Sequence, residues 1–245
     1  MIERNPLVSV VIPVFNEDDY LDVSMRYMLS QTAVRMGAAE IILVEYIKGM
    51  PIMVEQASPE LKKIKVGRKG ISYARNLGIV NAASTTRVIV NMDADSVFNR
   101  NDAIEIMAEP IINGRAMLTK CDVFHIDDID IEHNCIVRDS KTNDAVNFFR
   151  DLWHAFYLDM EKYLPVAHAS GLCFAKHAWK YVGGFWDHNM EDSQITTKIC
   201  GTYGLKSKMW IPEVCVFTSN RRIKPLDMSF FDWNLAPRKG GIYRT

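Results

Sequence analysis

The sequence predicts an α/β fold built on a Rossmann-like, mostly parallel mixed sheet flanked by helices. Two observations indicate this class: short apolar segments rich in β-branched residues alternate with segments of helical period, and the alternation continues through most of the chain. With 245 residues, 48% of them hydrophobic, the chain can bury one large core. We therefore expect a single domain whose ligands gather at the carboxyl ends of its strands.

The individual elements follow from the apolar pattern. The first strand is predicted at residues 7–14, LVSVVIPV, which is rich in valine and ends near the turn-forming Asn16. Further strands are predicted at residues 40–46, 61–66, 87–92, 115–124, 169–175 and 206–217. Helices are predicted at residues 18–31, 70–83, 102–112, 144–163 and 191–203. Residues 125–142 contain the acidic run HIDDIDIEH, for which a mobile lid and a solvated connection both stay open.

Charge and cysteine content exclude several classes of protein. The 29 Lys and Arg residues nearly balance 30 Asp and Glu residues, so no long-range field attracts nucleic acid. The five cysteines are scattered without CxxC spacing, which favours buried free thiols over disulfides or a zinc site. No transmembrane segment is predicted, and the N-terminus is typical of a first strand rather than a signal peptide. We expect a cytoplasmic protein.

A pair of aspartates follows the strand predicted at residues 87–92. Asp93 and Asp95 are separated by one residue, so on an extended strand their side chains point the same way. Their Cα atoms would then lie about 7 Å apart. A bend would instead let one carboxylate bind a divalent cation. Mg²⁺ keeps one or two protein carboxylates and completes its shell with water and phosphate oxygens, which suits a metal bound together with a diphosphate. Aspartates in loops also often cap helices or lie solvated in turns, and that alternative stays open.

Five segments, in chain order, resemble the family 2 glycosyltransferases of the GT-A fold: SVVIPVFNE, GISYARN, NMDADS, GLCFAKHAWKYVGGF and MEDSQ. The resemblance covers residues 9–205. It implies the GT-A fold and a metal-dependent, inverting transfer of a hexose from a nucleoside diphosphate sugar to an acceptor hydroxyl. Mn²⁺ or Mg²⁺ would be the cofactor, and the acceptor would be a carbohydrate, a lipid-linked molecule or a protein.

The resemblance also implies roles for individual residues. Asp95 and Asp93 match the DXD motif that binds the metal and the sugar nucleotide, with Asp95 as the direct ligand of the metal. Asp192, supported by Glu191, matches the base that takes a proton from the acceptor hydroxyl. Arg75 matches an arginine near the nucleotide, where its guanidinium can contact phosphate or a base edge. The remaining nucleotide-sugar residues would be Pro13, Val14, Asn16, Glu17, Glu45 and Ala94, and the acceptor residues Gly171, Gly184 and Trp186.

The domain organisation follows from the same resemblance. Residues 1–217 would form the GT-A domain, with residues 1–98 as the nucleotide-sugar half and residues 99–217 as the acceptor half. Residues 218–245 would form a basic and aromatic tail, for which peripheral membrane contact, contact with a neighbouring subunit and packing on the domain all stay open. No repeat or glycine-rich linker marks a boundary between the halves.

Several alternatives stay open. The family usually has a VDDGS turn where this chain has LVEYIKG, so either Glu45 substitutes for the base-reading aspartate or base recognition differs. Asp192 is also suited to cap a helix, and Arg75 to pair with a surface carboxylate. The string MDADSVF fits a haloacid-dehalogenase-like phosphatase with Asp93 as nucleophile, although that motif belongs on a first strand. A catalytically silent sugar-nucleotide-binding module is the remaining hypothesis.

Overall fold

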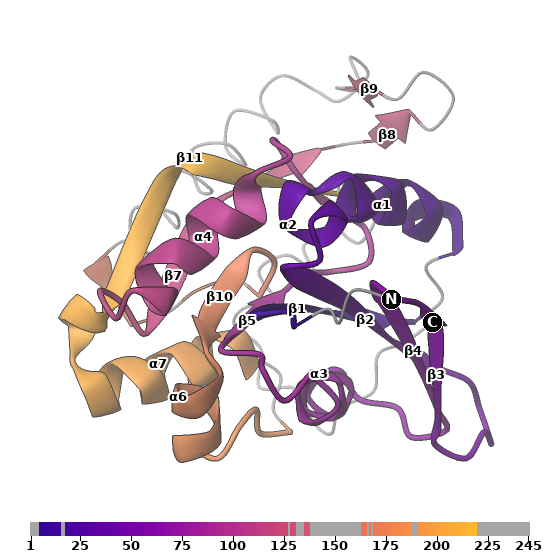
Figure 1. The fold of residues 1–245 in the computed structure, drawn as a ribbon, viewed down its shortest axis with the longest axis horizontal. Coiled ribbons are helices and arrows are strands. Elements are labelled where there is room, and N and C mark those ends of the chain that lie inside the picture. The colour runs from indigo at the N-terminus through magenta and orange to yellow at the C-terminus, as the bar shows by residue number, and fades with distance from the viewer. Residues whose placement is uncertain are drawn as a thin grey trace, which may run out of the picture.

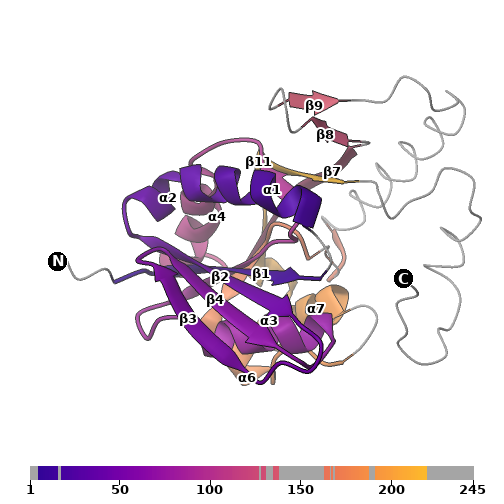
Figure 2. The ribbon, with the colours of Figure 1, turned by 90° about the vertical axis from the view of Figure 1, so that its right-hand side faces the viewer.

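A nine-stranded mixed sheet forms the centre of the protein. The computed structural model describes residues 5–15, 18–126, 128–130, 135–137, 163–165, 167, 169–187 and 191–219. The strand order is β3-β4-β2-β1-β5-β10-β7-β11-β6, with α1, α2 and α4 over one face and α3, α6 and α7 over the other (Figure 1, Figure 2). The predicted fold class is confirmed.

The first half alternates strands and helices as the sequence predicts. Its strands are β1 (Val8–Val14), β2 (Ala39–Tyr46), β3 (Met53–Ser58), β4 (Leu61–Val66), β5 (Val88–Asn91) and β6 (Ser96–Phe98). Its helices are α1 (Asp18–Ser30), α2 (Thr32–Arg35) and α3 (Ile71–Val80). Strands β4, β2, β1 and β5 are parallel neighbours, so their carboxyl ends meet at one edge of the sheet. The sequence does not predict β3, because this edge strand is almost entirely exposed and has no apolar alternation.

The second half is joined to the first by an antiparallel strand. Its strands are β7 (Leu118–Ile126), β8 (Asp128–Asp130), β9 (Cys135–Val137), β10 (Leu172–Ala175) and β11 (Lys208–Ser219), and its helices are α4 (Ala103–Ile112), α6 (Lys176–Tyr181) and α7 (Glu191–Tyr203). Strand β10 is antiparallel to both β5 and β7 and makes one continuous sheet of the two halves.

Some predicted segments are only partly described. Within residues 125–142, β8 and β9 form a small antiparallel ladder of their own. The helix predicted at residues 144–163 lies outside the described residues except for its last position, as does the tail beyond Ser219. The predicted domain boundaries stay predictions, and β11 continues two positions past the predicted end of the domain at residue 217.

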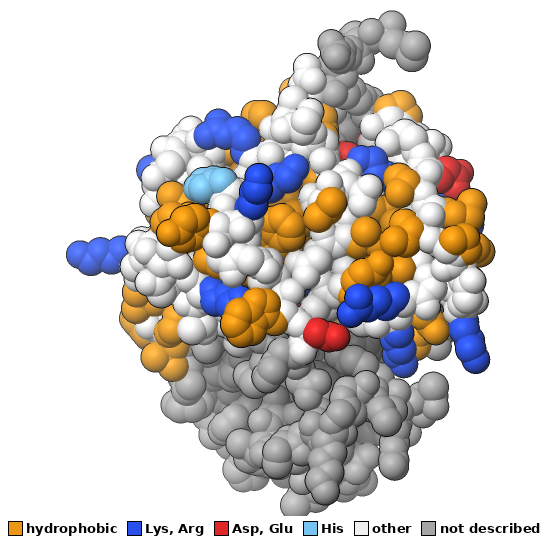
Figure 3. All heavy atoms as spheres, turned by 90° about the horizontal axis from the view of Figure 1, so that it is seen from below, with side chains coloured by type: hydrophobic (Ala, Val, Ile, Leu, Met, Phe, Trp, Pro, Cys, Tyr) orange, Lys and Arg blue, Asp and Glu red, His pale blue; other side chains and the backbone are white. Residues whose placement is uncertain are grey.

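The face around α3 and α6 is basic and apolar. Figure 3 views the molecule from this side and shows many Lys, Arg and hydrophobic side chains but few acidic ones. On α6 and in the turn after it, Tyr181 and Trp186 are 75% and 58% exposed. An anionic ligand would therefore meet little repulsion here.

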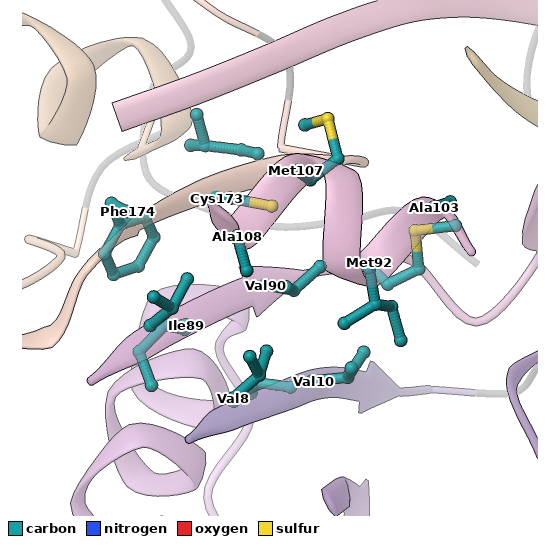
Figure 4. Close-up of a cluster of buried hydrophobic side chains, with 14 of the residues drawn as sticks. Val8, Val10, Ile89, Val90, Met92, Ala103, Met107, Ala108, Cys173 and Phe174 are labelled. Atoms are coloured by element: carbon teal, nitrogen blue, oxygen red, sulfur yellow. The ribbon is translucent and has the colours of Figure 1, made fainter. Parts of the chain in front are cut away.

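The main core lies between the sheet and α4. Figure 4 shows Val10 of β1 and Val90 of β5 on the side of the sheet that faces α4, the helix that carries Met107 and Ala108, and all four side chains are buried. Removal of such apolar surface from water is the main stabilising contribution in a fold of this kind. As predicted, Cys121, Cys173, Cys200 and Cys215 are free thiols, and the first three are buried.

Helix α3 packs closely on the other face of the sheet because it carries Gly78. A Cβ atom at Gly78 would lie 2.5 Å from Val11 Cγ1 and 3.2 Å from Val44 Cγ2. We expect Gly78→Ala to lower the free energy of unfolding by about 1–3 kcal/mol in urea denaturation. Gly201→Ala is the matched control, since a Cβ there meets no atom within 4 Å and should raise stability by about 0.5–1 kcal/mol. Equal stability of the two variants would contradict the close approach of α3.

Candidate active site

Asp93 and Asp95 follow β5 at the carboxyl edge of the parallel strands. The chain bends between them, because the Ser96 N–H donates to Asp93 O at 3.2 Å before β6 begins, and Ala94 is buried inside the bend. The Asp93 side chain is 36% exposed, whereas Asp95 is buried. The bend that the sequence left open is therefore present, and it places the two carboxylates in different surroundings.

Hydroxyl groups hold the Asp95 carboxylate. Its Oδ2 accepts a hydrogen bond from the Ser219 hydroxyl at 2.8 Å, and its Oδ1 accepts one from Thr218 at 3.4 Å. The network continues from Thr218 to the Ser96 hydroxyl at 2.9 Å, and from Ser96 to the Ser170 hydroxyl at 2.9 Å. Sequence reasoning missed these residues, because single serines and threonines at the ends of separate strands form no motif.

The turn that carries Ser170 contacts the bend that contains Asp93 and Asp95. The Asp93 N–H donates to Ser170 Oγ at 3.2 Å, and the fully buried Lys120 donates from Nζ to Ser170 O at 2.5 Å. The next residue, Gly171, has φ +69°, and a Cβ atom there would lie 2.8 Å from Val216 Cγ2. Gly171 is thus required for packing, and its contact with an acceptor stays a prediction.

Arg75 of α3 lies between the segments NMDADS and MEDSQ and contacts an acidic residue of each. Its side chain is 1% exposed, with Nη2 3.0 Å from Asp93 Oδ1 and Nη1 2.5 Å from Glu191 Oε1. Burial alone would lower the pKa of Arg75, but the Glu191 and Asp93 carboxylates raise it overall. The sequence left open a pair with a surface carboxylate, but Arg75 instead pairs with two carboxylates of the candidate site, one of them the buried Glu191. Contact with a nucleotide stays a prediction.

Helix α7 begins with the two acidic residues of the MEDSQ segment. Glu191 is buried against Arg75, and Asp192 Oδ1 accepts a hydrogen bond from the Ser193 N–H at 2.7 Å. Burial, and next repulsion from Glu191, raises the pKa of Asp192 to about 7, while Arg75 acts in the opposite direction. A carboxyl group that titrates near neutral pH in a cluster of charges is suited to accept a proton.

Asn76, in the same ARN motif, fixes the turn before α7. Its Nδ2 donates to Phe185 O at 2.7 Å, and its Oδ1 accepts from the Phe185 N–H at 3.0 Å. Gly184 has φ +73°, and a Cβ atom there would lie 2.9 Å from Asn76 Oδ1, so the turn requires glycine. Trp186 follows with its ring exposed, and Lys198 Nζ lies 3.3 Å from the ring centroid.

The predicted nucleotide residues of β1 and β2 lie at neighbouring strand ends. Val14 pairs in register with Glu45, and Pro13 precedes Val14 at half-buried depth. This register places Glu45 near the carboxyl end of β2, beside the end of β1, and its role in reading the base stays a prediction. Asn16 and Glu17 lie outside the described residues.

A metal ion would have few protein ligands at this site. Across the part of the chain that the structure describes, no group of three or more His, Cys, Asp or Glu side chains is arranged to hold one. Two carboxylates after β5 are nevertheless a donor set that fits a hard cation, because Mg²⁺ and similar ions take their other ligands from water and phosphate.

The comparison with protein families favours the glycosyltransferase fold over the phosphatase hypothesis. The model of "Glycosyl transferase family 2" matches residues 9–150, more than half of the chain. The chain belongs to glycosyl transferase family 2. The family is one of glycosyltransferases. The aspartate pair of this chain follows β5 rather than a first strand, which also disfavours the phosphatase hypothesis.

Solved glycosyltransferase structures have the same fold. The mannosyltransferase PcManGT from Pyrobaculum calidifontis, in complex with GDP-Man and Mn²⁺, is similar with a TM-score of 0.61 and 18% identity, over 87% of this chain and 56% of that one. S. aureus TarS 1-349 in complex with UDP-GlcNAc has a TM-score of 0.59 and 12% identity, over 92% of this chain and 64% of that one. These likenesses confirm the predicted GT-A fold.

A similar curated protein is the minor teichoic acid biosynthesis protein GgaA of Bacillus subtilis (strain 168). It is 28% identical over 101 residues, which are 39% of this glycosyltransferase and 23% of GgaA. The chain thus spans between 23% and 64% of the length of these relatives.

Among the described residues, no helix is long and apolar enough to cross a membrane.

Proposed function

We propose that this glycosyltransferase moves a hexose, with inversion, from a nucleoside diphosphate sugar to an acceptor hydroxyl, and that the reaction requires Mn²⁺ or Mg²⁺. The observation that carries the proposal is the cluster in which Arg75 joins Asp93 to Glu191. An inverting transfer needs a stabilised leaving diphosphate on one side of the sugar and a base on the other. Asp95, two positions after Asp93, would serve the leaving diphosphate through the metal, and Asp192, next to Glu191, would be the base.

The carboxylates after β5 would hold the cation. Asp95 is fixed by the hydroxyls of Thr218 and Ser219, and Asp93 is partly exposed beside it. When bound, the ion neutralises charge on the departing diphosphate. The complexes of PcManGT with GDP-Man and Mn²⁺, and of TarS with UDP-GlcNAc, support a sugar nucleotide and a divalent cation as ligands here.

Asp192 would take the proton of the acceptor hydroxyl, with Glu191 beside it. Trp186 offers an exposed ring that suits stacking on a sugar, and Lys198 adds a positive charge at its face. Carbohydrate, lipid-linked and protein acceptors all fit this description. Because the name of GgaA links that protein to teichoic acid biosynthesis, teichoic acid belongs among the acceptors to be tested.

We expect kcat/KM for transfer to fall as the pH decreases through about 7. Asp192 must be ionised to accept a proton, and its pKa is raised to about 7, so acidification protonates a growing fraction of the base. The measurement is kcat/KM from about pH 5 to about pH 9, which reports the ionisation of the free enzyme. An acid limb near pH 4, the ordinary range of a carboxyl group, would contradict this assignment.

A screen of sugar nucleotides tests the function as a whole. UDP-GlcNAc and GDP-Man are the first probes, and the matching donor should raise the melting temperature more with Mn²⁺ than without it, because a ligand of the native state stabilises it. Transfer is then measured as release of UDP or GDP in the presence of acceptors. Binding without release would favour the silent module, and hydrolysis of a generic phosphomonoester would favour the phosphatase. If no sugar nucleotide binds, the proposed function is wrong.

A further inference from the structure

Helix α3 connects parts of the site that are far apart in the sequence. Arg75 reaches Asp93, 18 positions away, and Glu191, 116 positions away. The adjacent Asn76 binds the backbone of Phe185, 109 positions away. Two consecutive residues of one helix therefore hold the donor-side aspartate, the acidic start of α7 and the turn before it.

Both terminal nitrogens of the Arg75 guanidinium are already paired with carboxylates. Nη1 and Nη2 donate to carboxylates at 2.5 and 3.0 Å, and the Phe185 ring centroid lies 5.7 Å from Cζ. A buried charge of this kind is costly unless carboxylates compensate it. The planar fork of arginine can serve two carboxylates at once, whereas the single ammonium of a lysine is a point charge.

We propose that Arg75 is a positioning residue, which holds Asp93 and Glu191 at a fixed separation and supplies the positive charge beside Asp192. The inference rests on the proposed function, in which Asp93 serves the donor and Asp192 is the base. It differs from the family-based expectation, because Arg75 acts here through protein carboxylates and needs no contact with the nucleotide.

Three charged groups act on Asp192 from the elements around it. Glu191 on the same helix and Asp93 after β5 both favour the protonated form, and Arg75 on α3 favours the ionised form. Loss of the Arg75 charge would leave both carboxylates unopposed, so Asp192 should keep its proton to higher pH. It would also free Asp93 and Glu191 to move apart.

The test compares Arg75→Met with Arg75→Lys in the full chain. The titration of Asp192 is followed by NMR of ¹³C-labelled aspartate without metal, and Asp192→Asn assigns its signal. In Arg75→Met the midpoint should move to higher pH, kcat should fall by about 100-fold or more, and the Kd for UDP or GDP measured without metal should change by less than about threefold. In Arg75→Lys the charge remains, so the midpoint should stay closer to wild type while kcat is still reduced.

Arg100→Met is the matched control, because Arg100 also pairs with a carboxylate, Asp102, but at the surface. Arg100→Met should change neither the titration midpoint of Asp192 nor kcat. An unmoved midpoint in Arg75→Met, or a loss of nucleotide affinity of about tenfold or more, would overturn the proposal. If Arg75→Met does not fold, wild-type kcat in Arg75→Lys would overturn it instead. The NMR titration needs no turnover, so failure of the wild type to transfer any sugar is recognised separately.

Discussion

Asp192→Asn should reduce kcat by a factor of about 100 to 10,000, because an amide cannot accept the proton of the acceptor hydroxyl. The side chain keeps its size, and its Oδ1 can still accept the hydrogen bond from the Ser193 N–H. Donor binding should therefore change little. The measurements are kcat for transfer and the Kd of the donor, and a variant that retains wild-type kcat would exclude Asp192 as the base.

The pH dependence of stability separates this loss of a base from damage to the fold. The pKa of Asp192 is raised from 3.8 to about 7 in the native state, so its ionisation removes native stability as the pH rises from about 4 to about 7. Asp192→Asn has no such group. Relative to wild type, the variant should therefore gain stability between pH 4 and pH 8, whereas a damaged fold would be less stable at both pH values. Asp102→Asn, at an exposed aspartate, is the control that should alter neither kcat nor this difference.

Much of the fold could be predicted because apolar runs indicate buried strands. The strands of the first half, apart from the exposed β3 and the short β6, lie close to their predicted positions. The direction of a strand and the identity of its neighbours could not be predicted in this way, because they depend on pairing between segments far apart in the chain. The segment LCFA is a strand as predicted, but its antiparallel position between β5 and β7 has no signal in its own residues.

The site was predictable to the extent that its residues form motifs at the ends of elements. Asp93 and Asp95 lie at the end of a buried strand, and the family resemblance indicated Asp192. The partners of Arg75 could not be predicted, because a charged residue on a helix carries no information on which distant carboxylate it meets. Thr218 and Ser219 reach Asp95 only because β11 pairs with β6, which a single sequence does not show.

Asp95→Asn should abolish the part of the thermal stabilisation by donor that depends on Mn²⁺, and should reduce transfer by about 1,000-fold or more. The cation contributes several kcal/mol at the departing diphosphate, and each 1.4 kcal/mol is about a factor of ten in rate. Asparagine keeps one oxygen but replaces the other with an NH₂ group, which cannot bind a cation. The Ser219 hydroxyl, which donates to Asp95 Oδ2 at 2.8 Å, can instead accept a hydrogen bond from that amide, so the fold should persist.

The measurement is the melting temperature with the matching sugar nucleotide, with and without Mn²⁺, followed by the rate of nucleoside diphosphate release. Ser219→Ala serves as a graded comparison, because it keeps both carboxylates and removes only one hydrogen bond to Asp95. It should weaken the response to Mn²⁺ without abolishing it. A full response to Mn²⁺ in Asp95→Asn would mean that Asp95 does not bind the ion, and Asp95 would then serve only to shape the bend between β5 and β6.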